Sequence, residues 1–242
     1  TTGVDNTAIG TNALGANDEG DDNVAIGKEA GLGILTSHNV AIGSESLSAA
    51  SGADCTAVGY QALNVNTGTD NVAFGSGTAV LNTSGSYNTA IGKGAYAGGT
   101  TGYSNTAIRY GTLSGTLTTT GSNNVAIGYT AGAGVRSKQN VAIGSAALNA
   151  ASGDDCTAIG YNALNVSTGA SNTAIGSGAG VLNVAGTNNT AIGQGAYATA
   201  TTALYNTAIG SGTLAGALTA TSGDNNIAIG YNALAANIAA DN

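Results

Sequence analysis

The sequence predicts an all-β protein, a repetitive parallel β-roll or β-solenoid of about 14 two-strand coils. The first observation is a five-residue motif, Asn124-Val125-Ala126-Ile127-Gly128, whose variants occur fourteen times at steps of 16 to 20 residues. Self-similarity at a short period is the signature of a solenoid. The second observation is composition. Because 40 of the 242 residues are Gly and only 5% are aromatic, the interior is expected to be thin and closely packed.

The aligned motifs predict the two sides of each coil. The third position is Ala in every copy, whereas the second and fourth are mostly Thr, Val or Ile. In an extended strand the second and fourth positions share one face and the third faces the other. Gly at the fifth position ends the strand at a turn. A second short strand is expected to carry a further column of Ala, Ser or Thr, so that two columns of small residues meet inside a flat roll.

The Asn that opens each copy is expected to form a ladder along the coils. Its amide can bond the backbone of its own turn and the Asn one coil above; alternatively, Asn is simply a residue that tolerates left-handed turn dihedrals. Three motif copies represent the predicted structural positions: Asn23, Ala25, Ile26, Gly27, Asn124, Ala126, Ile127, Gly128, Asn226, Ala228, Ile229 and Gly230.

Cys55 and Cys156 replace the opening Asn in two copies. Six coils separate them, so they are too far apart for a disulfide within one chain. A small buried residue in an Asn position is the favoured interpretation, and a contact between neighbouring chains stays open.

The motif copies are themselves arranged in a larger repeat. Asn23 and Asn124 open corresponding copies 101 residues apart, and Cys55 and Cys156 share the same separation. We therefore expect one repeat array over residues 1–242 that contains a duplicated six-repeat unit, about 23–123 and 124–225. Because repeat arrays need caps and none is visible, we expect the array to be a segment of a longer fibre.

Composition and charge argue against several classes of function. A net charge of −8 with five Lys and Arg residues gives no phosphate-binding stripe, so nucleic acid is not an expected partner. No apolar run reaches the roughly 20 residues that span a bilayer, so we expect no membrane insertion by this segment. His38 is the only His, and most acids precede strands as turn residues. We therefore expect neither an enzyme nor a cofactor.

Two weaker site signals remain. Asp18, Glu19, Asp21 and Asp22 form the densest acidic cluster and could supply oxygen ligands to calcium, but their spacing favours a hydrated loop. Candidate N-glycosylation acceptors, by the Asn-x-Ser/Thr pattern, are Asn82, Asn165 and Asn188.

The outward Ile and Val column would form a contiguous apolar stripe, which is typical of an interface. Self-association with cyclic symmetry would bury such a stripe.

The motif resembles the head repeat of trimeric autotransporter adhesins, Asn-Ser-Val-Ala-Ile-Gly, and related repeats of phage tail fibres, as in Asn226 to Leu234. The resemblance covers essentially the whole chain, although the repeats here are longer and Arg109 interrupts the Gly column. It implies a left-handed parallel β-roll and a homotrimer.

We therefore expect a structural or adhesive fibre segment, outside the cell, on its surface or on a virion, that attaches to a host surface protein or glycan. The alternatives are a non-adhesive filament subunit and the receptor-binding segment of a phage tail fibre. A polysaccharide-degrading tailspike and an ice-binding solenoid are less favoured alternatives. The first would need facing carboxylates and the second regular Thr ranks, and the sequence pattern indicates neither.

Overall fold

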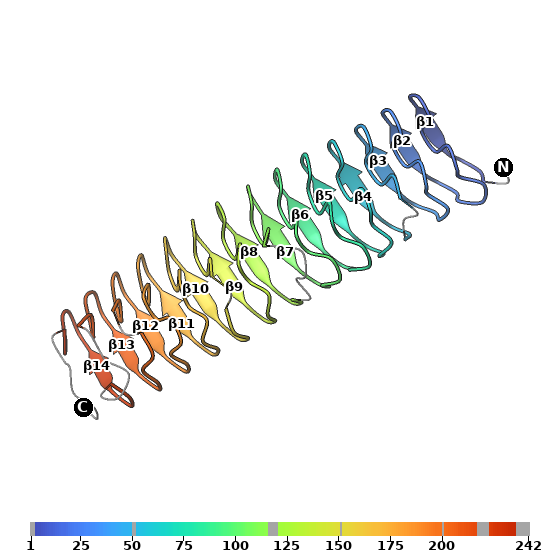
Figure 1. The fold of residues 1–242 in the computed structure, drawn as a ribbon. Coiled ribbons are helices and arrows are strands. Elements are labelled where there is room, and N and C mark those ends of the chain that lie inside the picture. The colour runs from blue at the N-terminus through green and yellow to red at the C-terminus, as the bar shows by residue number, and fades with distance from the viewer. Residues whose placement is uncertain are drawn as a thin grey trace. The chain divides into compact units, whose positions relative to one another are not determined.

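A computed structural model describes residues 3–49, 52–115, 121–150, 152–199, 201–216 and 223–235. Contacts within the chain divide it into two compact units, Thr1–Asn123 and Asn124–Asn242. The division falls where the second copy of the six-repeat unit is predicted to begin, although the duplication itself remains an inference from the sequence. Each unit is a parallel β-solenoid whose strands follow one another in chain order (Figure 1).

Each coil of the first unit contributes one three-residue strand at the motif. These strands are β1 (Thr7–Ile9), β2 (Val24–Ile26), β3 (Val40–Ile42), β4 (Thr56–Val58), β5 (Val72–Phe74), β6 (Thr89–Ile91) and β7 (Thr106–Ile108). All pair in parallel and in motif register, so that Ala41 lies beside Ala57 and Ala57 beside Ala73.

The second unit repeats this arrangement. Its strands are β8 (Val125–Ile127), β9 (Val141–Ile143), β10 (Thr157–Ile159), β11 (Thr173–Ile175), β12 (Thr190–Ile192), β13 (Thr207–Ile209) and β14 (Ile227–Ile229). The register again aligns the motif, with Ala158 beside both Ala142 and Ala174. The prediction of an all-β parallel solenoid is therefore confirmed.

A positive φ ends each strand at the fifth motif position. Gly59, for example, has a φ of 137°, and a Cβ there would press on the carbonyl of Gly75 in the next coil. Only Gly adopts such a conformation without strain. Arg109, which interrupts the Gly column, still has a φ of 100°. The turn is thus imposed by the stack on a residue poorly suited to it.

The predicted second strand is wrong. Among the described residues, the second small column lies in turns, because every second backbone position there has a positive φ, as at Gln61 (54°) and Leu63 (49°). β-strands require negative φ. Successive turns are nevertheless joined by regular hydrogen bonds, such as Leu47 N–H to Ala62 O at 3.0 Å and Leu63 N–H to Thr78 O at 3.0 Å.

The interior lies between the strands and this column of turns. The strand Ala residues meet the small residues of the turns, and Ala57 and Ala62 both have no exposed surface. Leu residues such as Leu63 and Leu164 fill the wider part of the coil beside them. Tyr96 and Tyr197 occupy this position in two coils, where their hydroxyls donate to Gly102 O and Ala203 O at 3.1 Å.

Candidate functional site

The outward face of the strands is the candidate interaction surface. It consists of two columns in each unit, formed by the second and fourth motif positions, which we call the outer columns. Ile26, Phe74 and Ile91 of the fourth position are 36%, 42% and 41% exposed, although they are large apolar side chains. The expectation that Ile lies outside the coil is confirmed, since Ile42 and Ile127 also lie half-buried on this face.

The opening Asn residues form the predicted ladder inside the coils. The side-chain oxygen of one Asn accepts the backbone N–H of its counterpart in the next coil, as in Asn39 N–H to Asn23 Oδ1 at 2.8 Å and Asn140 N–H to Asn124 Oδ1 at 2.9 Å. The amide nitrogen donates to a carbonyl of its own coil, as from Asn23 to Thr36 O at 2.9 Å. Each buried amide is thereby satisfied, which rigidifies the stack.

Cys55 and Cys156 take over the role of Asn in this ladder. The thiol of Cys55 lies 3.3 Å from Gly68 O, the carbonyl position that receives the Asn amide in other coils. Burial raises the pKa of both thiols. Both cysteines are free and have no exposed surface, so this fold leaves no route to a disulfide with a neighbouring chain.

The acidic residues of the first loop do not converge. Asp21 accepts the N–H of Val4 at 2.8 Å, whereas Asp22 faces His38. Asp18 and Glu19 line a shallow depression with Leu35. Within the part of the chain that the structure describes, no group of three His, Cys, Asp or Glu residues has the arrangement of a metal site.

His38 lies between carboxylates of the adjacent coils, 3.7 Å from Asp22 and 3.5 Å from Asp54. All three side chains are exposed, and all three residues have positive φ. Asp70 and Asp155 share this backbone conformation at the same place in their coils. The acids before strands are therefore turn residues, as predicted, and they lie at an exposed edge of their coils.

The three candidate glycosylation sites differ in access. Asn82 is fully buried, and its amide nitrogen donates to Asn66 Oδ1 at 3.0 Å and to Gly85 O at 2.9 Å. The folded coil leaves no room for a glycan there. Asn165 is half-buried and donates to Ala146 O at 2.9 Å, whereas Asn188 is exposed. Of the three, Asn188 alone is open to modification in the folded chain.

The tyrosines that follow the fifth motif position project outward. Tyr60, Tyr110, Tyr129, Tyr161 and Tyr231 are 51% to 80% exposed. They add aromatic side chains to one edge of the strand face, next to the outer columns.

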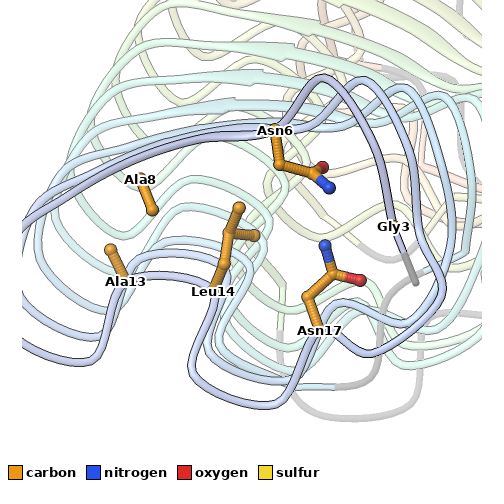
Figure 2. A pocket seen from close by; sticks show the side chains of 6 residues that line it. All are labelled: Gly3, Asn6, Ala8, Ala13, Leu14 and Asn17. Atoms are coloured by element: carbon orange, nitrogen blue, oxygen red, sulfur yellow. The ribbon is translucent and has the colours of Figure 1, made fainter. Parts of the chain in front are cut away.

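A pocket at the first coil is lined by Gly3, Asn6, Ala8, Ala13, Leu14 and Asn17. Figure 2 shows the side chains of the other five residues pointing into it from the strand and from the turns, beside the backbone of Gly3. Asn23, Ala25 and Ala30, the counterparts of Asn6, Ala8 and Ala13 in the next coil, are core residues without exposed surface. The pocket is therefore the solenoid core seen from its end, and no acid, base or thiol lines it.

Sequence reasoning missed a second buried polar column, which consists of Asn17, Asn66, Asn82, Ser167 and Asn183. Each donates its backbone N–H to the residue three positions earlier, as Asn66 does to Leu63 O at 3.2 Å. The recurrence of Asn or Ser three residues after the Leu position was the available signal. These residues connect the turn side of the coil to the Asn ladder, since Asn71 donates to Asn66 Oδ1 at 3.1 Å.

No described helix is long and apolar enough to cross a membrane. No protein-family model, curated protein or solved structure matches this chain. The functional interpretation therefore depends on the geometry of the coils and their faces.

Proposed function

We propose that this chain is a structural and adhesive segment of an extracellular fibre, carried on a cell surface or a virion. Copies of the chain associate through the outer columns, three around one axis, with left-handed coils. The loops and exposed edges attach to a host surface protein or glycan. No catalytic step belongs to this role.

The observation that carries the proposal is that the small apolar residue of each strand is buried while the large apolar residue beside it is exposed. Ala25 is fully buried while Ile26, its neighbour in the chain, is 36% exposed. The same holds for Ala90 at 1% and Ile91 at 41%. Because the strands pair in register, these exposed side chains stand in continuous columns within each unit, and contiguous apolar surface of this kind is typical of protein interfaces.

Dense hydrogen bonding between the coils supports a structural role. Hydrogen bonds between coils run through the strands, the turns and the Asn ladder, for example Gly43 N–H to Ile26 O at 2.8 Å and Asn88 N–H to Asn71 Oδ1 at 2.9 Å. Pulling two coils apart therefore breaks several hydrogen bonds at once, which suits a spacer.

The adhesive part is tested with beads that carry the purified full chain, under flow over surfaces coated with fetuin, with bacterial lipopolysaccharide or with albumin. Retention on fetuin alone supports attachment to a sialylated host glycoprotein. Retention on lipopolysaccharide alone favours the receptor-binding segment of a phage tail fibre. A chain that self-associates but is retained nowhere is a non-adhesive filament subunit, which contradicts adhesion and leaves the structural role intact.

A further inference from the structure

The two units differ at one corresponding pair of buried residues. Cys55 and Cys156 are equivalent, so positions in the two units correspond at a separation of 156 − 55 = 101 residues. By this separation Asn66 corresponds to Ser167, and Asn82 to Asn183. All four side chains are fully buried in the second polar column.

In the first unit this pair is fully hydrogen-bonded. Asn66 Oδ1 accepts the amide N–H groups of Asn71 at 3.1 Å and of Asn82 at 3.0 Å, and its amide nitrogen donates to Gly68 O at 2.8 Å. Asn82 Oδ1 accepts the N–H of Gly85 at 3.1 Å. The carboxamide of Asn66 is thus the centre of a small polar network.

In the second unit the centre of this network is a shorter side chain. Neither Ser167 Oγ nor Asn183 Oδ1 has a hydrogen-bond partner among the protein atoms. The amide nitrogen of Asn183 reaches Gly186 O only at 3.4 Å, whereas the equivalent distance from Asn82 to Gly85 O is 2.9 Å. A buried polar atom without a partner costs roughly 1–3 kcal/mol, and two such atoms at adjacent positions point to a bound group that satisfies both.

We propose that a single water molecule is bound inside the second unit, between Ser167 and Asn183, where the Asn66 carboxamide lies in the first unit. Replacement of a carboxamide by a hydroxyl frees a volume on the order of one water, about 30 Å³. The water donates one hydrogen to Asn183 Oδ1 and bonds the hydroxyl of Ser167, which donates or accepts. The counterparts of the other Asn66 partners, Asn172 and Gly169, offer a donor and an acceptor for the remaining bonds.

The chemistry of the neighbours favours water over a cation. The amide nitrogen of Asn71 points at Asn66 Oδ1 in the first unit, and its counterpart on Asn172 would turn the same hydrogens toward the bound group. A cation would meet these hydrogens unfavourably, whereas a water oxygen accepts them. Buried waters typically make about three hydrogen bonds to otherwise unsatisfied polar groups.

The experiment is a crystal structure of the full chain that resolves ordered water, together with magnetic relaxation dispersion of water, which counts long-lived buried waters. The expected result is one water within hydrogen-bonding distance of both Ser167 Oγ and Asn183 Oδ1. Two reciprocal variants sharpen the test. Ser167→Asn places the carboxamide of the first unit in the site and should lower the count by one. Asn66→Ser copies the second unit into the first and should raise it by one.

The proposal is overturned if the wild-type protein shows no water there and Asn183 Oδ1 instead accepts the N–H of Gly186, as Asn82 does with Gly85. An unchanged water count in a folded Ser167→Asn protein also overturns it. If a variant fails to fold, the proposal is decided by whether the electron density of the wild-type crystal shows a water beside Ser167.

Discussion

The two sides of each strand carry apolar residues in the reverse of the usual order. Ala73 and Ala90 are 0% and 1% exposed inside the coil, whereas Phe74 and Ile91, the next residues, are 42% and 41% exposed. Soluble proteins normally bury the larger apolar residue. Here the distance between two backbone layers selects the inner residue, whereas the outer residue remains partly exposed in the described part of the chain. The packing of the inner Ala residues therefore determines how stably a coil folds, and the outer columns are available for association.

The largest expected effect is on the inside. Replacement of Ala90 by Leu should destabilise the first unit by about 3 kcal/mol or more, because Ala90 lies in register between Ala73 and Ala107 and an added side chain would push the layers apart. The measurement is urea unfolding followed by the reactivity of the buried Cys55 thiol.

The matched control on the outside is Ile91→Leu, whose effect on unfolding should stay within about 0.5 kcal/mol. Equal urea midpoints for Ala90→Leu and the wild-type protein would show that the two layers are not closely packed.

The next effect concerns the Asn ladder. Asn71→Ala should lower the free energy of unfolding by roughly 2–4 kcal/mol, because its loss leaves buried polar groups without partners. The side chain of Asn71 donates to Asn66 and to Gly85 O, and it accepts both the backbone N–H and the side-chain amide of Asn88. Thermal unfolding followed by circular dichroism measures the loss. Asn188→Ala, at an exposed position, is the control and should have little effect; a similar loss in both variants would contradict a special role for the ladder.

A third effect is a loss of stability in alkali. Burial raises the pKa of Tyr96 to about 12 from an ordinary value of 10.0, and burial likewise raises the pKa of Tyr197. Between these pH values the unfolded chain loses the Tyr96 proton and the folded chain keeps it. The stabilisation is therefore complete below pH 10 and is lost as the pH rises to 12, by roughly 2–3 kcal/mol for Tyr96.

Urea midpoints between pH 9 and 12 measure this loss, and Tyr96→Phe should flatten the part that is due to Tyr96. A wild-type midpoint that does not change over this range would show that the ring is accessible to water.

The smallest effect on folding is expected on the outside. Single Ser substitutions of Ile26, Ile42 or Ile91 should change the unfolding free energy of an isolated unit by less than about 1 kcal/mol, because these side chains are already partly in water. The same substitutions should weaken self-association, which sedimentation velocity measures. An Ile variant that unfolds the unit as readily as Ala90→Leu would abolish the distinction between the two sides.

The strand side of the coil was predictable because its sequence pattern is local and repeated. Alternation places Ala41 and Ile42 on opposite faces whatever the rest of the coil does, and identical motifs can only stack in register. The Asn ladder follows from the same repetition, since residues such as Asn23 and Asn39 must lie one above the other.

The turn side was not predictable from propensity. Leu63 and Leu164 have φ values of 49° and 45°, a conformation that is rare for Leu, so nothing local distinguishes this stretch from a short strand. The glycosylation pattern at Asn82 misled for a related reason. Asn82 fits a glycosylation pattern, yet its place in the coil, three residues after the turn at Ala79, puts its side chain inside.

The most direct test of the central claim is the mass of the purified chain in solution, measured by light scattering beside a variant with Ser at Ile26, Ile42 and Ile91. Association through the outer columns predicts a wild-type particle of three times the 23.0 kDa of one chain and a lighter particle for the folded variant. A wild-type particle with the mass of a single chain, stable across concentration, would contradict the account.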